Sequence, residues 1–115
     1  MNFKEKLKRN HLSIGSWITI GHTSIVEIMA TADFDWLAID MEHSAITLDK
    51  AQELILAIKS KDIKALVRVG RNDELIIKRV MDSGADGVIV PMVNSEEDAK
   101  RAVSAVKYPP NGNRG

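Results

Sequence analysis

The stretch Trp36-Leu37-Ala38-Ile39-Asp40-Met41-Glu42-His43 decides the fold that this chain is expected to adopt. An apolar run ends abruptly there at two carboxylates and an imidazole. Parallel strands that are buried on both faces read as continuous apolar runs, and their carboxyl ends often carry functional residues. The alternative is that these polar residues only begin a solvated loop. The remainder of the chain has to decide between the two interpretations.

Composition removes several classes of protein. Lys+Arg and Asp+Glu both number 16, so a zero net charge gives no electrostatic reason to expect a nucleic acid or an anionic membrane as partner. The absence of cysteine excludes disulfides and thiolate metal sites. No apolar run approaches the ~20 residues of a membrane span, and the basic start lacks the apolar stretch of a secretory signal. We therefore expect a cytoplasmic protein whose residues 1–115 form one domain.

Hydrophobic periodicity predicts a short helix over residues 2–10, followed by four strand–helix pairs. The predicted strands are 13–20, 35–39, 64–69 and 88–90. The predicted helix starts are a capping box at Ser24, Thr47 as N-cap, Asn72 as N-cap, and Ser95 paired with Asp98. The inward positions expected on the last two helices are Leu75, Ile76, Val80 and Met81, then Ala99, Ala102, Val103 and Val106.

Alternation of this kind predicts a parallel sheet with helices outside it. Two architectures satisfy it: a doubly wound open sheet, or part of a (βα)8 barrel. The glycine-rich nucleotide fingerprints of open sheets are absent. Four units are half of eight, and a complete barrel needs roughly 200 residues or more. We therefore expect an α/β fold, a (βα)4 half of a TIM barrel, which is either incomplete or completed by pairing with another chain.

Three groups in this frame are candidates for chemistry. An imidazole takes up and releases protons near neutral pH, so His43 is either a general base or a surface histidine. Asp40 and Glu42 share one face of an extended segment, where they either hold a divalent cation or are solvated. Arg68 lies in an apolar strand, so it either grips a carboxylate or oxyanion, or forms an ion pair with Asp40 or Glu42. Trp17, near the end of the first strand, is a packing residue or a pocket wall.

Four separated motifs carry a resemblance to a known family. They are FDWLAIDMEH (34–43), LVRV (66–69) followed by Asn72-Asp73, MDSGADGVIVPMVNSEEDAKRAV (81–103) and YPPNGNRG (108–115). In this order the chain, from about residue 13 to 115, resembles the 4-hydroxy-2-oxoheptanedioate/2-dehydro-3-deoxyglucarate aldolases. These are class II (metal-dependent) pyruvate aldolases related to citrate lyase β subunits.

The resemblance implies a (βα)8 barrel in a homo-oligomer that reversibly cleaves a 4-hydroxy-2-oxo acid into pyruvate and an aldehyde, using Mg²⁺ or Mn²⁺. His43 falls on the family's general base, and Arg68 on the arginine that holds the pyruvate carboxylate or enolate oxygen. Asp82 falls on an aspartate that partners the histidine, and Trp17 on the tryptophan of the substrate pocket. Glu42 falls on a carboxylate that reaches the metal through a water.

Two features do not fit a complete enzyme. Asp82 is expected to end a helix, at the face of a barrel opposite the strand carboxyl ends, so either that boundary differs or its contact with His43 crosses a subunit interface. The family's direct metal ligands, a Glu and an Asp on strands five and six, would lie beyond Gly115, so no direct ligand is expected in this chain. The alternative function is a non-catalytic half-barrel acting as an assembly or regulatory subunit.

Overall fold

A computed structural model describes all 115 residues as four strands that alternate with helices, after one additional helix at the start. The elements are α1 (Phe3–Lys8), β1 (Gly15–Ile18), α2 (Thr23–Met29), β2 (Trp36–Asp40), α3 (Leu48–Lys59), β3 (Lys64–Arg68), α4 (Glu74–Asp82), β4 (Gly87–Ile89) and α5 (Glu96–Val106). The predicted strand–helix order is confirmed, with strand boundaries that differ from the predicted ones by at most two residues.

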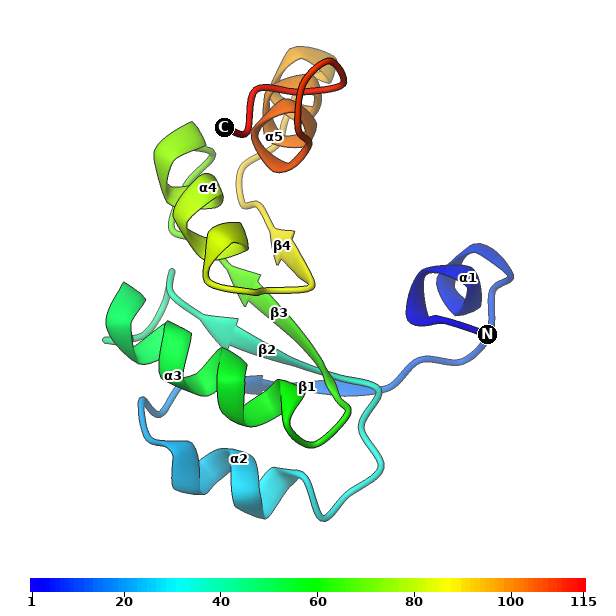
Figure 1. Cartoon of the computed structure of the whole chain (residues 1–115), viewed down its shortest axis with the longest axis vertical. Helices are drawn as coiled ribbons and strands as arrows, with labels where there is room; N and C mark the ends of the chain where they lie inside the picture. The colour runs from blue at the N-terminus through cyan, green and yellow to red at the C-terminus, as the bar shows by residue number, and fades with distance from the viewer.

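The order of the strands selects the barrel architecture. All neighbouring strands are parallel and follow the chain, β1-β2-β3-β4, without the reversal of order that defines a doubly wound sheet. Figure 1 shows α2, α3 and α4 along one side of the strands, while α1 lies on its own beyond their amino ends. The fold is therefore the predicted α/β half-barrel.

One face of the curved sheet is covered by helices and the other is not. Ile18, Ile39 and Val67 face the helices and are at most 1% exposed. On the other face, which is the barrel interior, Trp17, Ala38, Leu66 and Gly87 lie in one register row, and Asp40, Arg68 and Ile89 in the next. No further strand covers this interior face, and Trp17 remains 41% exposed.

Close packing at the amino end of the sheet requires a glycine. A Cβ atom on Gly15 would come within 1.9 Å of Cδ2 of Trp36, so the Trp36 ring packs directly on the bare backbone of β1. The Trp36 ring meets that of Trp17 edge to face, with 6.5 Å between centroids. The two tryptophan rings thus pack against each other on the interior face of the half-barrel.

Two predicted helix starts are wrong. Helix α2 begins at Thr23 with His22 as N-cap, because the His22 ring accepts the Ser24 N–H at 3.0 Å. Helix α4 is capped by Asp73, whose carboxylate accepts the Ile76 N–H at 3.0 Å. Asn72 instead donates to the Asp98 carbonyl at 2.9 Å. The predicted N-caps Thr47 and Ser95 are confirmed as the N-cap residues of α3 and α5.

Some predicted inward positions are also wrong. In α4, Ile77 and Val80 are buried while Leu75 is 50% exposed, because the side of the helix that carries Ile77 and Val80 packs on the core. In α5, Ala105 is buried, whereas Val103 is 50% exposed in an open hollow that it lines together with Val88 and Val90, because the sheet ends at β4. None of the helices is long and apolar enough to cross a membrane.

Candidate active site at the carboxyl ends of β2 and β3

The site is built where two neighbouring strands end. Asp40 closes β2 and lies in register with Arg68, which closes β3. Arg68 donates from Nη2 to Asp40 Oδ2 at 2.6 Å and from Nε to Asp40 Oδ1 at 3.1 Å. Parallel strands placed side by side bring these residues together, because equivalent positions of such strands face the same way. The pair is a two-point, charge-assisted contact.

Asp40 is the only charged residue in the buried set, at 3% exposure. Besides the two Arg68 contacts, its Oδ1 accepts the N–H groups of Glu42 at 2.9 Å and His43 at 3.0 Å. The Arg68 hydrogen bond is the main cause that lowers the pKa of Asp40 to about 2, the two backbone N–H groups add to this, and burial opposes it. Asp40 is therefore ionised at neutral pH, and its carboxylate oxygens accept four hydrogen bonds from protein donors.

These same contacts shape the loop that follows β2. The N–H groups of Glu42 and His43 turn back onto Asp40, and the Ser44 hydroxyl donates to the Asp40 carbonyl. Met41 continues the sheet ladder by donating to the Arg68 carbonyl at 2.9 Å. The chain thus folds back as soon as the strand ends, and Glu42 and His43 are held at the sheet edge beside Arg68.

The Arg68 guanidinium is fixed on several sides. Its Cζ lies 4.4 Å from the centroid of the Trp17 ring, and its Nε lies 3.5 Å from Oε1 of Glu42. The hydrogen bond to Asp40 is the main cause that raises the pKa of Arg68, and its side chain is 26% exposed. Because Nε and Nη2 face Asp40, the edge formed by Nη1 and Nη2 is the one left for a ligand.

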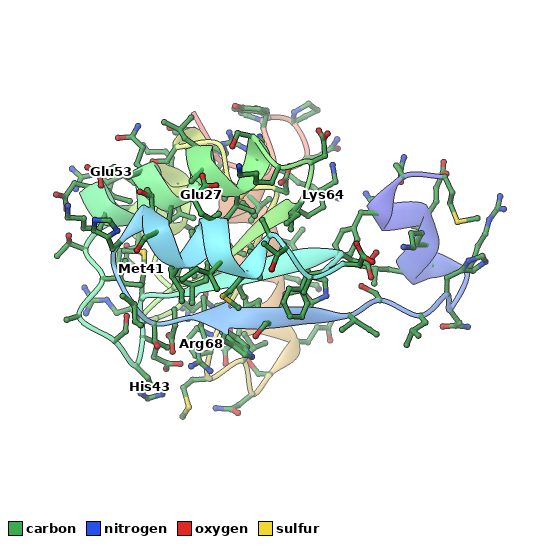
Figure 2. The ribbon with its side chains drawn as sticks, turned by 90° about the horizontal axis from the view of Figure 1, so that it is seen from below. Glu27, Met41, His43, Glu53, Lys64 and Arg68 are labelled. Atoms are coloured by element: carbon green, nitrogen blue, oxygen red, sulfur yellow. The ribbon has the colours of Figure 1, made fainter.

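His43 lies next to this guanidinium but is far more accessible. Its side chain is 70% exposed, and its Nε2 lies 3.4 Å from Oε1 of Glu42. Glu42 therefore stands between Arg68 and His43, within 3.5 Å of both. In Figure 2, Arg68 and His43 are on the lower side of the strands, opposite Glu53 of α3. Four of the predicted site residues, Trp17, Glu42, His43 and Arg68, thus meet at one edge.

Asp82 is not part of this group. It ends α4, as predicted, and its carboxylate accepts Nε of Arg114 at 3.1 Å. Arg114 also donates to the Val106 carbonyl at 3.3 Å and lies 4.4 Å over the Tyr108 ring. The expected contact between Asp82 and His43 is not made within one chain, and its other route, across a subunit interface, stays a prediction.

The residues present do not form a metal site by themselves. No group of three or more His, Asp or Glu side chains converges in the chain. Asp40, one of the two carboxylates with cation-binding spacing, is already bound by four protein donors. The Glu42 carboxylate is not enclosed by four donors as that of Asp40 is. Its chemistry fits contact with a metal ion through a water molecule.

The sequence predicted Asp40 either as a cation-binding carboxylate together with Glu42 or as one possible partner of Arg68, and not as the residue that joins Arg68 to the following loop. The structure places it at the centre of the site, with the largest share of contacts. The available signal was its position, since an aspartate that is the last residue of an apolar run must find donors.

Solved structures and curated proteins resemble this chain. The fold matches a HpcH/HpaI aldolase from Desulfitobacterium hafniense (TM-score 0.90, 34% identity, 100% of this chain and 45% of that one). It also matches the citrate synthase SbnG (TM-score 0.91, 32% identity, 98% of this chain and 46% of that one). The sequence is 42% identical over 95% of its length to 2-dehydro-3,6-dideoxy-6-sulfogluconate aldolase of Pseudomonas putida, covering 43% of that protein.

A further relative is the hydroxypyruvate/pyruvate aldolase of Roseobacter denitrificans, which is 39% identical over 98% of this chain and 44% of its own length. The chain therefore spans about half the length of the curated relatives it matches. Residues 13–115 match the HpcH/HpaI aldolase/citrate lyase family, and the chain belongs to that family.

Proposed function

We propose that the whole protein containing this chain is a class II pyruvate aldolase, which reversibly cleaves a 4-hydroxy-2-oxo acid into pyruvate and an aldehyde. The observation that carries the proposal is the pairing of an anchored cation with an accessible base at one sheet edge. Arg68 has an unused Nη1/Nη2 edge, and His43 lies beyond Glu42 on the same side. Family membership and the names of the relatives point to the same chemistry.

Arg68 binds and stabilises the 2-oxo acid in this proposal. Its unused edge offers parallel N–H donors to the substrate carboxylate, and its charge stabilises the oxygen that becomes negative when the enolate forms. Trp17 supports the guanidinium from one face and forms a wall of the substrate pocket. Because Asp40 holds the other edge, the guanidinium does not have to reorganise when charge develops.

His43 moves the proton. Cleavage begins when a base takes the proton of the C4 hydroxyl, the C3–C4 bond breaks, and its electron pair moves into the C2 carbonyl to give the pyruvate enolate and a free aldehyde. Protonation of C3 then gives pyruvate. Glu42 lies 3.4 Å from Nε2 of His43, and the His43 side chain is 70% exposed, so the imidazole is accessible for the first transfer, directly or through a water.

The proposal includes a divalent ion, Mg²⁺ or Mn²⁺, as cofactor of the whole protein. Such an ion would supply a Lewis acid for the 2-oxo acid. Its direct ligands would have to come from residues outside these 115, since this chain offers Glu42 alone as an outer contact.

We also propose that the whole protein works in the cytoplasm as a homo-oligomer on small-molecule substrates. The position of Asp82 supports a contact with the active site of a neighbouring subunit. Its side chain is 48% exposed, and its contact with Nε of Arg114 at 3.1 Å holds it in place. In such an assembly Asp82 would accept a hydrogen bond from His43 of the partner subunit.

The test is an aldolase assay on the purified chain and on the longest product of the reading frame that encodes it. Each is mixed with pyruvate and a small aldehyde, with Mn²⁺ and then with chelator. We expect metal-dependent formation of a 4-hydroxy-2-oxo acid, and a loss of about 100-fold or more in His43→Ala. Chelator-insensitive turnover would contradict the metal-dependent mechanism.

The second candidate is a half-barrel without catalysis, which acts as an assembly or regulatory subunit. The observation in its favour is the open sheet, with β1 and β4 as unpaired edges and Trp17 exposed on the uncovered face. It predicts a stable dimer of this chain and no affinity for metal. Light scattering together with a calorimetric Mn²⁺ titration separates the two candidates.

A further inference from the structure

The carboxylate of Asp40 joins the two parts of the site that the proposed chemistry uses. On one side it holds Nε and Nη2 of Arg68. On the other it accepts the N–H groups of Glu42 and His43. No other residue contacts both the guanidinium and the backbone of this loop through hydrogen bonds of 3.1 Å or less.

We propose that Asp40 is the positioning residue of the site, which aims the free Nη1/Nη2 edge of Arg68 and holds the loop that carries His43. The proposal rests on the proposed function. It does not make Asp40 a catalytic residue, because its carboxylate is enclosed by protein donors and is 3% exposed.

The geometry restricts how a ligand can bind. An arginine grips a carboxylate with two parallel donors along its Nε/Nη2 edge or along its Nη1/Nη2 edge. Asp40 occupies the first edge, and the centroid of the Trp17 ring lies 4.4 Å from Cζ of the guanidinium. A 2-oxo acid can therefore be gripped with two donors only along Nη1 and Nη2, which fixes the direction of its carbon chain relative to His43.

Asparagine at position 40 separates the two tasks of the aspartate. In Asp40→Asn the side-chain carbonyl, in the place of Oδ1, can still accept the N–H groups of Glu42 and His43 and the Nε–H of Arg68. The amide NH₂, in the place of Oδ2, faces the Nη2 donor of Arg68 and cannot accept from it. Asp40→Ala removes both tasks. Asp35→Asn is a matched control, because Asp35 at the other end of β2 also binds a cation, Lys6, and one backbone N–H, that of Ile14.

The first experiment measures hydrogen exchange in the full chain by NMR. In the unmutated chain the Nε–H of Arg68 should exchange about 10-fold or more slowly than that of Arg71, whose side chain is 76% exposed. Asp40→Asn should leave the Arg68 Nε–H and the Glu42 and His43 amides protected, because Oδ1 accepts all three, whereas Asp40→Ala should release all of them. The Nη2 hydrogens of Arg68, whose acceptor is Oδ2, should exchange faster in both variants. Equal exchange of the two arginines before any mutation would overturn the proposal, so the test does not depend on the variants folding.

The second experiment measures enolate formation as the exchange of pyruvate methyl protons with deuterium, using the longest product of the reading frame and Mn²⁺. Asp40→Asn should reduce the rate about 100-fold, the loss expected when a catalytic group is misplaced by about 1 Å, and raise the KM for pyruvate. Asp35→Asn should leave both unchanged. Exchange at the unmutated rate in Asp40→Asn would refute the positioning role, whereas no exchange before mutation would refute the proposed function and leave the NMR result to decide on Asp40.

Discussion

The two ends of β2 carry the same kind of contact and use it differently. At the amino end, Asp35 binds Nζ of Lys6 at 2.7 Å and accepts the Ile14 N–H at 2.8 Å. At the carboxyl end, Asp40 binds two nitrogens of Arg68 and accepts two loop N–H groups. The Asp35 side chain is 27% exposed and that of Asp40 is 4% exposed.

This difference in exposure indicates that Asp35 has a structural role and that Asp40 belongs to the candidate site. Asp35 attaches the otherwise isolated helix α1 to the strand, and water solvates its carboxylate when the contact breaks. Asp40 has no such alternative, because a buried carboxylate without its donors is strongly disfavoured. A chain gains little stability from burying a charge pair, so its occurrence at a sheet edge beside an accessible histidine fits a functional role better than a structural one.

The largest expected effect on the free energy of unfolding comes from removing the cationic side chain that binds each aspartate. Arg68→Ala leaves Asp40 charged and buried, and should cost about 3 kcal/mol of the free energy of unfolding. Lys6→Ala should cost less than about 1 kcal/mol. Urea unfolding followed by circular dichroism measures both values.

The same Arg68 substitution should reduce aldolase turnover of the whole protein by about 10² to 10³, as the loss of an oxyanion donor does. Arg68→Lys should not restore it, because an ammonium cannot contact Asp40 and a substrate with two pairs of donors. Equal destabilisation by Arg68→Ala and Lys6→Ala would remove the distinction between the two ends.

The second effect concerns the packing of the Trp36 ring on Gly15 at the amino end of the sheet. Gly15→Ala places a methyl group into the Trp36 ring, which must move, and such overpacking costs about 1–3 kcal/mol. Since Gly15 lies at the opposite end of the sheet from Asp40, the Arg68 Nε–H should keep its protection in this variant. A loss of that protection would mean that the packing of the amino end controls the site, and that the two ends are not independent.

The third effect is the response to acid. The pKa of Asp40 is lowered to about 2 by Arg68, below an ordinary value of about 3.9 in the unfolded chain. Its contribution to stability, about 2 kcal/mol, is therefore complete above about pH 4 and is lost as the pH falls through 2. The urea midpoint of the unmutated chain should fall between pH 4 and 2, and Asp40→Asn should flatten that part of the curve more than Asp35→Asn.

Sequence reasoning predicted the half-barrel because its signals are local. Apolar runs, turn residues and caps repeat four times, and the parallel order follows from the short connections between them. It failed for Leu75 and Val103, since the inward face of a helix depends on where its neighbours end. In α4 the buried pair is Ile77 and Val80, and Leu75 lies on the exposed side of the helix.

The sequence predicted which polar side chains lie together at the carboxyl ends of β2 and β3, but not how they contact one another. His43, Glu42 and Arg68 were recognisable as polar groups at strand ends, and their proximity followed from adjacent parallel strands. That Asp40 takes one whole edge of the guanidinium depends on side-chain directions, which no spacing rule supplies. The missing contact of Asp82 has another cause, since one chain places it at the end of α4 with Arg114.

The smallest expected effect is a difference between the two ends of β2 in how salt changes the destabilisation caused by removing the cation. The Lys6–Asp35 contact is partly exposed, and raising the ionic strength from about 0.01 M to 1 M shortens the screening length from about 30 Å to about 3 Å. The destabilisation by Lys6→Ala should therefore fall from about 0.5 kcal/mol toward zero in NaCl. That by Arg68→Ala should change little, because protein atoms rather than ions surround Asp40. If salt weakened both effects equally, the Asp40 carboxylate would be accessible to solvent ions, and its role in aiming Arg68 would lose its physical basis.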